Sequence, residues 1–585
     1  MRAILIYGLV LLAGPAVAQL AYPEVTAAAG LPDLSAEALA VGDYDNDGWP
    51  DVYASNPRGP NQLLRNNADG TFTDVAPALG LTLGADYATS AAAWIDYDND
   101  GYDDLYVACR ERPDLLYRNR GDGTFADVTA AAGLGQYGTP QAIVVADFDN
   151  DGWPDLYVAN FGRANVCYRN NGDGTFSDRS LTAGAYDTGA SMGALAFDYE
   201  QDGDADLLLI RDSYDPTLLY RNDGTGVFTE VAAAAGINTQ SFGMGADVGD
   251  LNRDGFSDVY ITNLYGNYLL LGEAGGTFRN VSGPAGTDDP GMGWGVTFLD
   301  ADNDGWEDLY VANEHGFSPF PNVLYRNQGN EAFAAVLTDA AVCNRFNTLA
   351  AVALDYDQDG REDLLVANRR TAERCQLFRN ASAPAGFVQF ALRGTTSNRR
   401  GVGATLSVRT ADSTLYYREV TAGSGWKSQK GPFLHFGLGA GAGAVMVEVR
   451  WPGGAVQTYG PLVGQARYTL VEGGTALAGF VTDAPLMTAL DADPASATAP
   501  RLRVAPVPFG GERLRIELAD GRAGDVLTVT DPLGRTSYRQ RIGRAGPVAL
   551  DLGRAELGVG KSGLYVVRLQ RGNGSTARLL PCFFR

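Results

Sequence analysis

Histidine is nearly missing from this 585-residue chain, which contains two. A metal centre built from several histidines is therefore excluded, and imidazole-based catalysis has very few candidate residues. Positive charge is also scarce, because 45 Lys+Arg stand against 70 Asp+Glu, a formal net charge of −25. Since a phosphate backbone favours a basic surface, no nucleic-acid partner is expected. The five cysteines include no Cys-x-x-Cys pair, so the sequence gives no support for zinc or redox motifs.

Long apolar runs are missing after the first residues of the chain. Met1-Arg2 precedes an almost wholly apolar stretch, residues 3–13, and Ala16-Val17-Ala18 then offers small residues typical of a cleavage site. We expect residues 1–18 to be a secretory signal peptide; the alternative is a buried first strand or helix. No other run approaches 20 apolar residues, so no transmembrane segment is expected and the protein is predicted to be exported.

Acidic loops are abundant. The nine-residue pattern D-x-D-x-D-G-x-x-D recurs seven times, with start-to-start spacings of 53, 51, 51, 52, 50 and 55 residues. A repeat of this regularity indicates a repeat architecture. The predicted metal ligands, loop by loop, are Asp43, Asp45, Asp47 and Asp51; Asp96, Asp98, Asp100 and Asp104; Asp147, Asp149, Asp151 and Asp155; Asp198, Glu200, Asp202 and Asp206; Asp250, Asn252, Asp254 and Asp258; Asp300, Asp302, Asp304 and Asp308; Asp355, Asp357, Asp359 and Asp363.

Calcium is the cation that these loops suit. It takes six to eight oxygen ligands, and carboxylates at positions 1, 3, 5 and 9 of a tight loop can converge on one ion, with a glycine at position 6 allowing the turn. The alternative is a set of metal-free Asx-rich turns. We expect up to seven Ca²⁺, with weaker binding in the fourth loop, where Glu200 replaces Asp, and in the fifth, where Asn252 is neutral.

Between the acidic loops a second element recurs, as in residues 115–129, with Asn, Asp and Gly between two apolar stretches. Four short strands every ~50 residues predict one propeller blade per period. Residues 22–31 match the fourth-strand stretch of the repeats, so the N-terminus is expected to complete the last blade. The fold class predicted is all-β, with a seven-bladed calcium-binding β-propeller over residues 19–382. These repeats resemble the FG-GAP/VCBS family, which also supplies the integrin α-subunit propeller, and the resemblance implies a calcium-stabilised propeller.

Strand parity places the connections between second and third strands, and between the fourth strand and the next sheet, at the end opposite the acidic loops. These connections are the less repetitive ones, and their aromatic and arginine residues suggest a ligand surface; ordinary loop packing is the alternative. The candidate ligand-binding residues are Trp294, His315, Phe317, Arg369 and Arg370. Cysteines fall at the same end, so two disulfides are expected, Cys343–Cys375 and Cys109–Cys167, with four free thiols as the alternative.

Two modules follow the repeats. Gly423-Ser-Gly425-Trp, Leu434-His-Phe436-Gly and Val449-Arg-Trp451-Pro closely resemble the ASPIC/UnbV domain, expected here over residues 386–474 as a small β domain. Residues 475–500, rich in Ala, Thr, Asp and Pro, are predicted to be a linker. Residues 501–585 contain short strands of a β-sandwich. Pro506-Val-Pro508-Phe and Ser562-Gly-Leu-Tyr resemble the sorting domain of type IX secretion, which implies that machinery as a partner and a Bacteroidetes-type bacterium as the source.

These features together favour a secreted or cell-surface calcium-binding protein that binds an extracellular protein or glycan through its propeller face, without catalysis. One alternative is a secreted polysaccharide-active lyase or hydrolase on a calcium propeller. Such enzymes need paired carboxylates, and Glu314, beside His315, is the best candidate among the carboxylates that are not assigned to calcium loops. Another alternative is a structural scaffold of a surface complex.

Overall fold

The computed structural model describes residues 20–31, 34–336, 341–369, 373–440 and 443–480, together with the backbone of the strands between 502 and 584. Residues 1–18 and 481–500, expected as signal peptide and as most of the linker, lie outside the described residues. The chain divides into two compact units, Met1–Pro485 and Leu486–Arg585. In the described ranges, no helix has both the length and the apolar character needed to cross a membrane.

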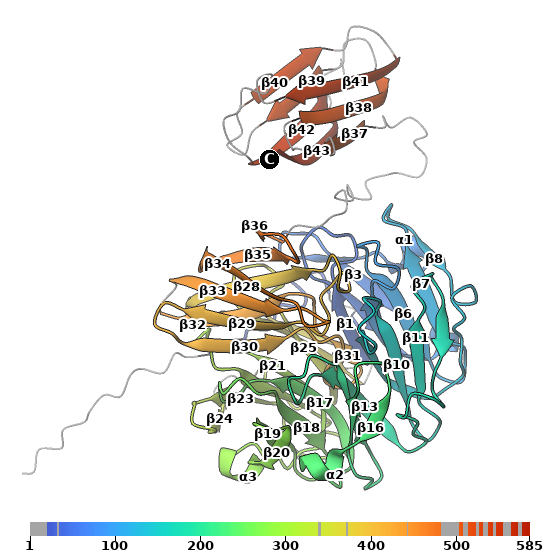
Figure 1. The fold of residues 1–585 in the computed structure, drawn as a ribbon, viewed down its shortest axis with the longest axis vertical. Helices are drawn as coiled ribbons and strands as arrows, with labels where there is room; N and C mark the ends of the chain where they lie inside the picture. Colours follow the sequence, from blue (N-terminus) through green and yellow to red (C-terminus); the bar gives the residue numbers. More distant parts are fainter. Residues whose placement is uncertain are drawn as a thin grey trace, which may run out of the picture. The chain divides into compact units, whose positions relative to one another are not determined.

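The repeat region is all-β, as predicted, and consists of successive antiparallel sheets whose strands follow chain order (Figure 1). We number them repeat sheets 1 to 7. The first three comprise β1 (Ala38–Gly42), β2 (Asp51–Ser55), β3 (Gln62–Asn66) and β4 (Phe72–Asp74); β5 (Thr89–Ile95), β6 (Asp104–Cys109), β7 (Leu115–Asn119) and β8 (Phe125–Asp127); β9 (Pro140–Ala146), β10 (Asp155–Asn160), β11 (Val166–Asn170) and β12 (Phe176–Asp178).

The remaining repeat sheets follow the same plan, except that the seventh has three strands. They comprise β13 (Ser191–Phe197), β14 (Asp206–Arg211), β15 (Leu218–Asn222) and β16 (Phe228–Glu230); β17 (Gly243–Gly249), β18 (Asp258–Asn263), β19 (Tyr268–Glu273) and β20 (Thr277–Asn280); β21 (Gly293–Leu299), β22 (Asp308–Asn313), β23 (Val323–Asn327) and β24 (Phe333–Ala335); β25 (Thr348–Leu354), β26 (Asp363–Asn368) and β27 (Gln376–Phe378). Connections between sheets hold the short helices α1 (Ala76–Leu79), α2 (Ala232–Ala235) and α3 (Ser282–Ala285) and the 3-10 helix η1 (Ala85–Tyr87).

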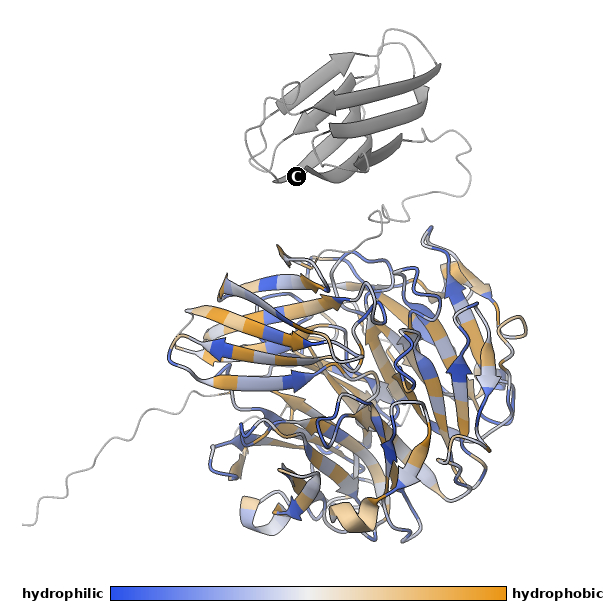
Figure 2. Cartoon of the chain, in the orientation of Figure 1, coloured by the Kyte–Doolittle hydropathy of each residue, from blue (hydrophilic) through white to orange (hydrophobic). Residues whose placement is uncertain are grey.

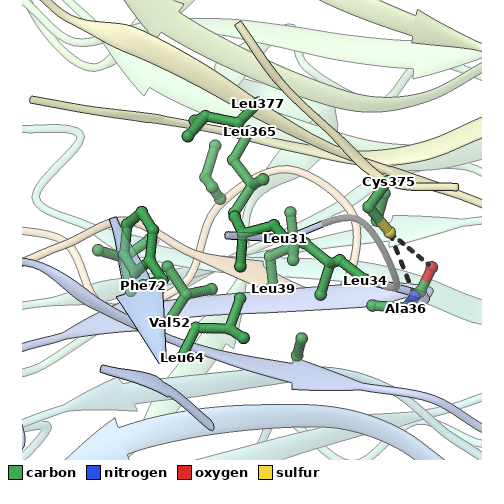
Figure 3. Packing of buried hydrophobic residues seen from close by; sticks show 14 of the residues in the cluster. Leu31, Leu34, Ala36, Leu39, Val52, Leu64, Phe72, Leu365, Cys375 and Leu377 are labelled. Carbon is green, nitrogen blue, oxygen red and sulfur yellow. Dashed lines mark hydrogen bonds between the residues drawn. The ribbon is translucent and has the colours of Figure 1, made fainter. Parts of the chain in front are cut away.

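Apolar side chains fill the space between each repeat sheet and the next, in a series of separate clusters. The hydropathy colouring shows the orange bands of these strands against polar loops (Figure 2). The last cluster joins sheet 7 to sheet 1: Leu365 and Leu377 pack with Leu39, Val52 and Leu64 (Figure 3). Repeated sheets that pack in sequence, the last against the first, are consistent with a β-propeller.

The N-terminal segment lies beside β27 and supplies the missing edge of repeat sheet 7. Val25 donates its backbone N–H to the carbonyl of Leu377 at 2.8 Å, and Glu24 forms a β-bridge with Phe378. Tyr22 is fully buried between sheets 6 and 7, and its hydroxyl donates to the carbonyl of Glu362 at 3.1 Å. Main-chain pairing here covers an edge that would otherwise be open.

The two expected disulfides are wrong, because the four cysteines form no disulfide among the described residues. Cys109 packs between sheets 1 and 2, whereas Cys167 packs between sheets 3 and 4. Cys375 packs between sheets 7 and 1, where its sulfur accepts the backbone N–H of Ala36 at 3.2 Å (Figure 3). Cys343 lies on the other face of sheet 7, toward sheet 6. Loops that share one end of the sheets can therefore direct their sulfurs into different inter-sheet spaces.

After the repeats come two sheets with one apolar core between them, which we call the module. Its strands are β28 (Gly386–Arg393), β29 (Thr405–Thr410), β30 (Leu415–Glu419), β32 (Leu434–Gly439), β33 (Ala444–Arg450), β34 (Val456–Val463), β35 (Ala466–Val471) and β36 (Ala476–Ala478). A short strand from the same segment, β31 (Ser428–Gln429), leaves the module and pairs in parallel with β1.

The second unit contains two sheets, ordered β37-β38-β41 and β40-β39-β42-β43. Its strands are β37 (Leu502–Pro506), β38 (Arg513–Gly521), β39 (Val526–Thr530), β40 (Thr536–Arg541), β41 (Gly546–Gly553), β42 (Gly563–Gln570) and β43 (Thr576–Phe584).

Candidate functional site

Each acidic loop joins the first and second strands of a repeat sheet, and its tight turn follows from two backbone positions. Asn46 and Gly48 in the first loop have φ of 56° and 85°, in the left-handed region. Glycine adopts this region without steric cost, and asparagine more readily than most other residues. The carboxylate of Asp43 accepts the N–H groups of Asp47 and Gly48, both at 3.0 Å. The loop is thereby closed around its own first residue.

Five of the seven loops bring three carboxylates together, with one oxygen from each within 4.8 Å of the others. The groups are Asp43, Asp45 and Asp51; Asp96, Asp98 and Asp104; Asp147, Asp149 and Asp155; Asp300, Asp302 and Asp304; Asp355, Asp357 and Asp359. Hard oxygen donors at this spacing suit a cation such as Ca²⁺.

Several carboxylate oxygens in these loops are buried and have no hydrogen-bond donor. They are Oδ1 of Asp45, Asp96, Asp98, Asp149, Asp302 and Asp355. Burial raises the pKa of Asp96 to about 8 and that of Asp147 to about 7, chiefly because desolvation disfavours the charged form. A bound cation would satisfy these oxygens and restore the charged form, so the residues present fit calcium.

The fourth and fifth loops, although fully described, form no group of this kind. The Glu200 carboxylate in the fourth loop lies 3.9 Å from the guanidinium of Arg221. In the fifth loop, Asn252 donates from its amide to Asp254 Oδ2 at 2.8 Å. The predicted ligands of these two loops, among them Asp202, Asp206 and Asp250, therefore supply no group of three carboxylates close enough to share one ion.

The last aspartate of each loop also accepts hydrogen bonds that connect the loop to the third strand of its sheet. Asp155 accepts the backbone N–H of Phe148 with one oxygen, at 3.1 Å, and that of Asn170 with the other, at 2.6 Å. The Asn170 side chain then donates to the carbonyl of Tyr97, in the acidic loop of the preceding sheet, at 2.8 Å. Such bonds tie neighbouring sheets together at the loops.

The third-strand asparagines are functional residues that the sequence pattern does not single out, although Tyr-Arg-Asn recurs in several repeats. The same bond to the preceding sheet is made by Asn66, Asn119, Asn170, Asn222, Asn327 and Asn380. In sheet 5 the position is Gly272, which can make no such side-chain bond.

The module covers the end of the sheets that carries the acidic loops, which we call the acidic end. Arg400 contacts Asp103 through Nε at 2.7 Å. Arg467 contacts Oδ2 of Asp355 at 2.8 Å. His435 Nε2 lies 2.7 Å from Oδ1 of Asn303. Side chains of the module therefore contact the acidic loops directly.

The opposite end of the sheets collects the exposed aromatic side chains. Every aromatic residue that is exposed in the described ranges lies in a second-to-third-strand connection or in a connection to the next sheet. They are Tyr137, Phe161, Tyr186, Tyr214, Tyr265, Phe317 and Phe320.

The five residues predicted to bind a ligand fall into different environments. Phe317 is exposed, whereas Trp294 is buried because Trp426 of the module packs on it, with ring centroids 4.6 Å apart. Arg369 forms an ion pair with Glu314 at 2.9 Å. Next to Glu314, His315 is partly exposed, and its Nδ1 is buried without a hydrogen-bond partner. Arg370 lies outside the described residues.

Two curated proteins similar to this chain are both cartilage acidic protein 1. The Mus musculus protein is 26% identical over 459 residues, covering 71% of this chain and 70% of that protein. The Homo sapiens protein is 25% identical over 459 residues, with 71% and 68% covered.

Among solved structures, an Agrocybe aegerita lectin described as recognising non-reducing terminal N-acetylglucosamine is similar at 18% identity and a TM-score of 0.35, covering 57% of this chain and 86% of that one. The Bacillus licheniformis rhamnogalacturonan lyase PL11 is similar at 14% identity and a TM-score of 0.34, with 70% and 75% covered.

Two family profiles match the chain. The profile ASPIC and UnbV matches residues 394–477, within the module and its last strand. The FG-GAP-like repeat profile matches residues 43–107, 96–158, 147–209, 198–261, 250–311 and 300–366. These overlapping matches cover more than half of the 585 residues. The chain therefore belongs to the family of FG-GAP-like repeat proteins.

Proposed function

We propose that this is a secreted or cell-surface, non-enzymatic binding protein whose seven repeat sheets form a calcium-loaded propeller that binds an extracellular protein or glycan. The single observation that carries the proposal is the gathering of exposed aromatic side chains at the end opposite the acidic loops. Aromatic side chains supply large contact areas at binding surfaces, and contiguous exposed ones mark interaction sites. The module covers the acidic end, so the opposite end is the one left for a ligand.

Calcium has a supporting role in this proposal. The five carboxylate groups lie in the loops that hydrogen bonds connect to neighbouring sheets. The exposed aromatic residues lie in the connections at the other end of the strands. Ca²⁺ bound there would neutralise buried charge and stiffen the loops on which the module rests. Glu314, the carboxylate that a hydrolase or lyase would need, is held by Arg369 at 2.9 Å, which favours a binding role for this region.

The test is binding of the calcium-loaded full chain to arrays of extracellular glycans and matrix proteins. The double variant Tyr265→Ala and Phe317→Ala should lose most of the binding found with the unaltered protein, since these two aromatic residues are among the most exposed. The matched control is Val456→Ala with Val463→Ala, which removes exposed apolar side chains from the module instead. Equal binding by both double variants would contradict the proposed surface.

We further propose that residues 1–18 direct export and that residues 501–585 are a type IX sorting domain removed after passage through the outer membrane. Support comes from the sequence motifs and from the division of the chain near Pro485. Mass spectrometry of the exported protein should then find a product that starts near residue 19 and ends near residue 500. An exported product with the tail intact would contradict removal of the tail.

A further inference from the structure

Lys427 is a buried lysine whose ammonium nitrogen has no hydrogen-bond partner. The residue is 3% exposed, and its backbone φ of 55° lies in the left-handed region. The nitrogen lies 4.2 Å from the centre of the Trp426 ring. Burying an unpaired charge and straining the backbone both cost free energy. A residue kept in this state is a candidate for a role in function.

The module delivers this lysine into the middle of the repeat sheets. Residues 422–429 leave the module and pair with the first strands of three different sheets. Ala422 forms a bridge with Val145 in β9, Gly425 one with Ala246 in β17, and Ser428 pairs with Leu39 in β1. Because residues 422–429 pair with the first strands of three separate sheets, this segment must run between those strands. Lys427 therefore lies among the first strands, in the centre of the arrangement of repeat sheets.

The charges that act on Lys427 come from the end opposite the acidic loops. They are Arg110, Glu37, Arg369 and Arg58. Burial lowers the pKa of Lys427 well below its ordinary value, and the three arginines lower it further while Glu37 opposes them. We call Arg58, Arg110, Arg369 and Lys427 the basic cluster. It is a concentration of positive charge in a chain whose formal net charge is −25.

The basic cluster is held in place by few carboxylates. Arg58 contacts Glu37 at 2.7 Å and donates to the backbone carbonyl of Arg369, also at 2.7 Å. Arg369 contacts Glu314 at 2.9 Å. Arg110 donates to the hydroxyl of Ser90, at the long distance of 3.4 Å, and burial lowers its pKa. Among the described residues, the ion pairs of the cluster join Glu37 to Arg58 and Glu314 to Arg369, and both arginines remain about half exposed.

Unused donors and acceptors accompany the cluster. The indole N–H groups of Trp294 and Trp426 and the ammonium of Lys427 are buried donors without an acceptor. Oε2 of Glu314 is a buried acceptor without a donor. An anionic group would satisfy the donors, and a hydroxyl would satisfy the acceptor. A ligand that carries both an anionic group and hydroxyl groups is an acidic saccharide, and exposed Phe317 offers an aromatic face for a sugar ring nearby in the chain.

We propose that the basic cluster binds the carboxylate or sulfate group of an acidic saccharide, and that Lys427, carried by the module, completes this site. The proposal rests on the binding function proposed above and names its ligand class. The repeats supply the arginines at the open end, and the module supplies the lysine from within. Recognition would therefore need both parts of the first unit.

The test is titration calorimetry of the calcium-loaded full chain with three probes: a galacturonate tetrasaccharide, a heparin-derived sulfated tetrasaccharide and neutral maltotetraose. At least one acidic probe should bind, and at least tenfold more tightly than the neutral one; which of them binds identifies the anionic group. Lys427→Met and Arg369→Gln should each weaken that binding at least tenfold. The matched control is Arg163→Gln, which removes an exposed positive charge at the same end, from an arginine paired with Glu111 outside the cluster.

Equal weakening by Lys427→Met and Arg163→Gln would overturn the site, since it would mean attraction by charge in general. Binding of neither acidic probe would also overturn it. Should Lys427→Met fail to fold, half-exposed Arg369→Gln decides the matter alone. If the arrays show binding that depends on Tyr265 and Phe317 while both acidic probes fail, the ligand class is wrong and the proposed binding function stands. If both fail, the proposed function falls too.

Discussion

Asn170 and Asn171 are neighbours in the chain with different surroundings. The Asn170 side chain is buried and donates to the carbonyl of Tyr97 in the preceding sheet, whereas Asn171 is exposed and bonds within its own turn to Thr175. Asn170→Ala leaves a buried carbonyl without its donor, which costs about 1–3 kcal/mol. We expect that loss in the free energy of unfolding from urea denaturation. Asn171→Ala is the control, and an equal loss there would contradict the inter-sheet role.

Asp114 occupies a position that is asparagine in several other repeats. It accepts the hydroxyl of Tyr106 and the N–H of Cys109, both at 2.8 Å, as Asn165 in sheet 3 bonds the equivalent tyrosine and strand end. Desolvation raises the pKa of Asp114 to about 7. The folded state then binds more protons than the unfolded state, so its stability falls as pH rises from about 4 through about 7.

Asp114→Asn should remove that loss, so its stabilising effect should be about 2–3 kcal/mol larger at pH 8 than at pH 5. Urea denaturation of both proteins at the two pH values measures it. The reverse substitution, Asn165→Asp, should introduce the same pH dependence into sheet 3. A constant difference between Asp114→Asn and the unaltered protein at both pH values would contradict the argument.

At the scale of elements, the sequence predicts the positions of loops and strands well, but it predicts the contacts between elements poorly. The spacing of Asp and Gly predicted where each acidic loop begins, and the apolar runs after Gly152 and its equivalents predicted the second strands. Both signals are local. The bond from Asn170 to Tyr97 joins residues 73 apart, and no periodicity marks its partner.

The N-terminal segment is an element that acts on a distant sheet. Tyr22 is fully buried beside Leu364 and Phe378, although it lies more than 300 residues before them. Tyr22→Ala would leave a cavity and remove one of the two hydrogen bonds to the carbonyl of Glu362, the other coming from Asn380. We expect it to lower the free energy of unfolding by about 3–5 kcal/mol. Exposed Tyr137→Ala is the control. A loss below about 1 kcal/mol for Tyr22→Ala would mean that the segment is not needed to hold sheet 7.

At the scale of the whole molecule, the sequence does not predict how the module docks on the repeat sheets. Arg400 and Asp103 are nearly 300 residues apart, and nothing near either one predicts the pair. Trp294 lies near the start of β21, at the end opposite the acidic loops, which favours a surface position, yet Trp426 of the module packs on it. The disulfide prediction is wrong for a related reason. The end of the sheet at which a cysteine lies does not determine the inter-sheet space into which its side chain points.

Calcium should stabilise the first unit as a whole, because its candidate sites lie in the loops that hydrogen bonds such as Asn170–Tyr97 connect to the neighbouring sheet. A ligand that binds only the folded state adds about 2.7 kcal/mol per independent site at a hundred times its Kd. Five carboxylate groups therefore predict a large rise in Tm of the full chain when Ca²⁺ replaces chelator, and a calorimetric stoichiometry near five.

Asp98→Asn should remove one site. Asn252→Asp should add one, because it frees Asp254 from the amide that it now accepts and gives the fifth loop its missing carboxylate. A Tm that chelator does not change would make the acidic loops metal-free turns. A stoichiometry near seven would instead mean that Glu200 and Asn252 move on binding, since in this structure neither loop gathers three carboxylates.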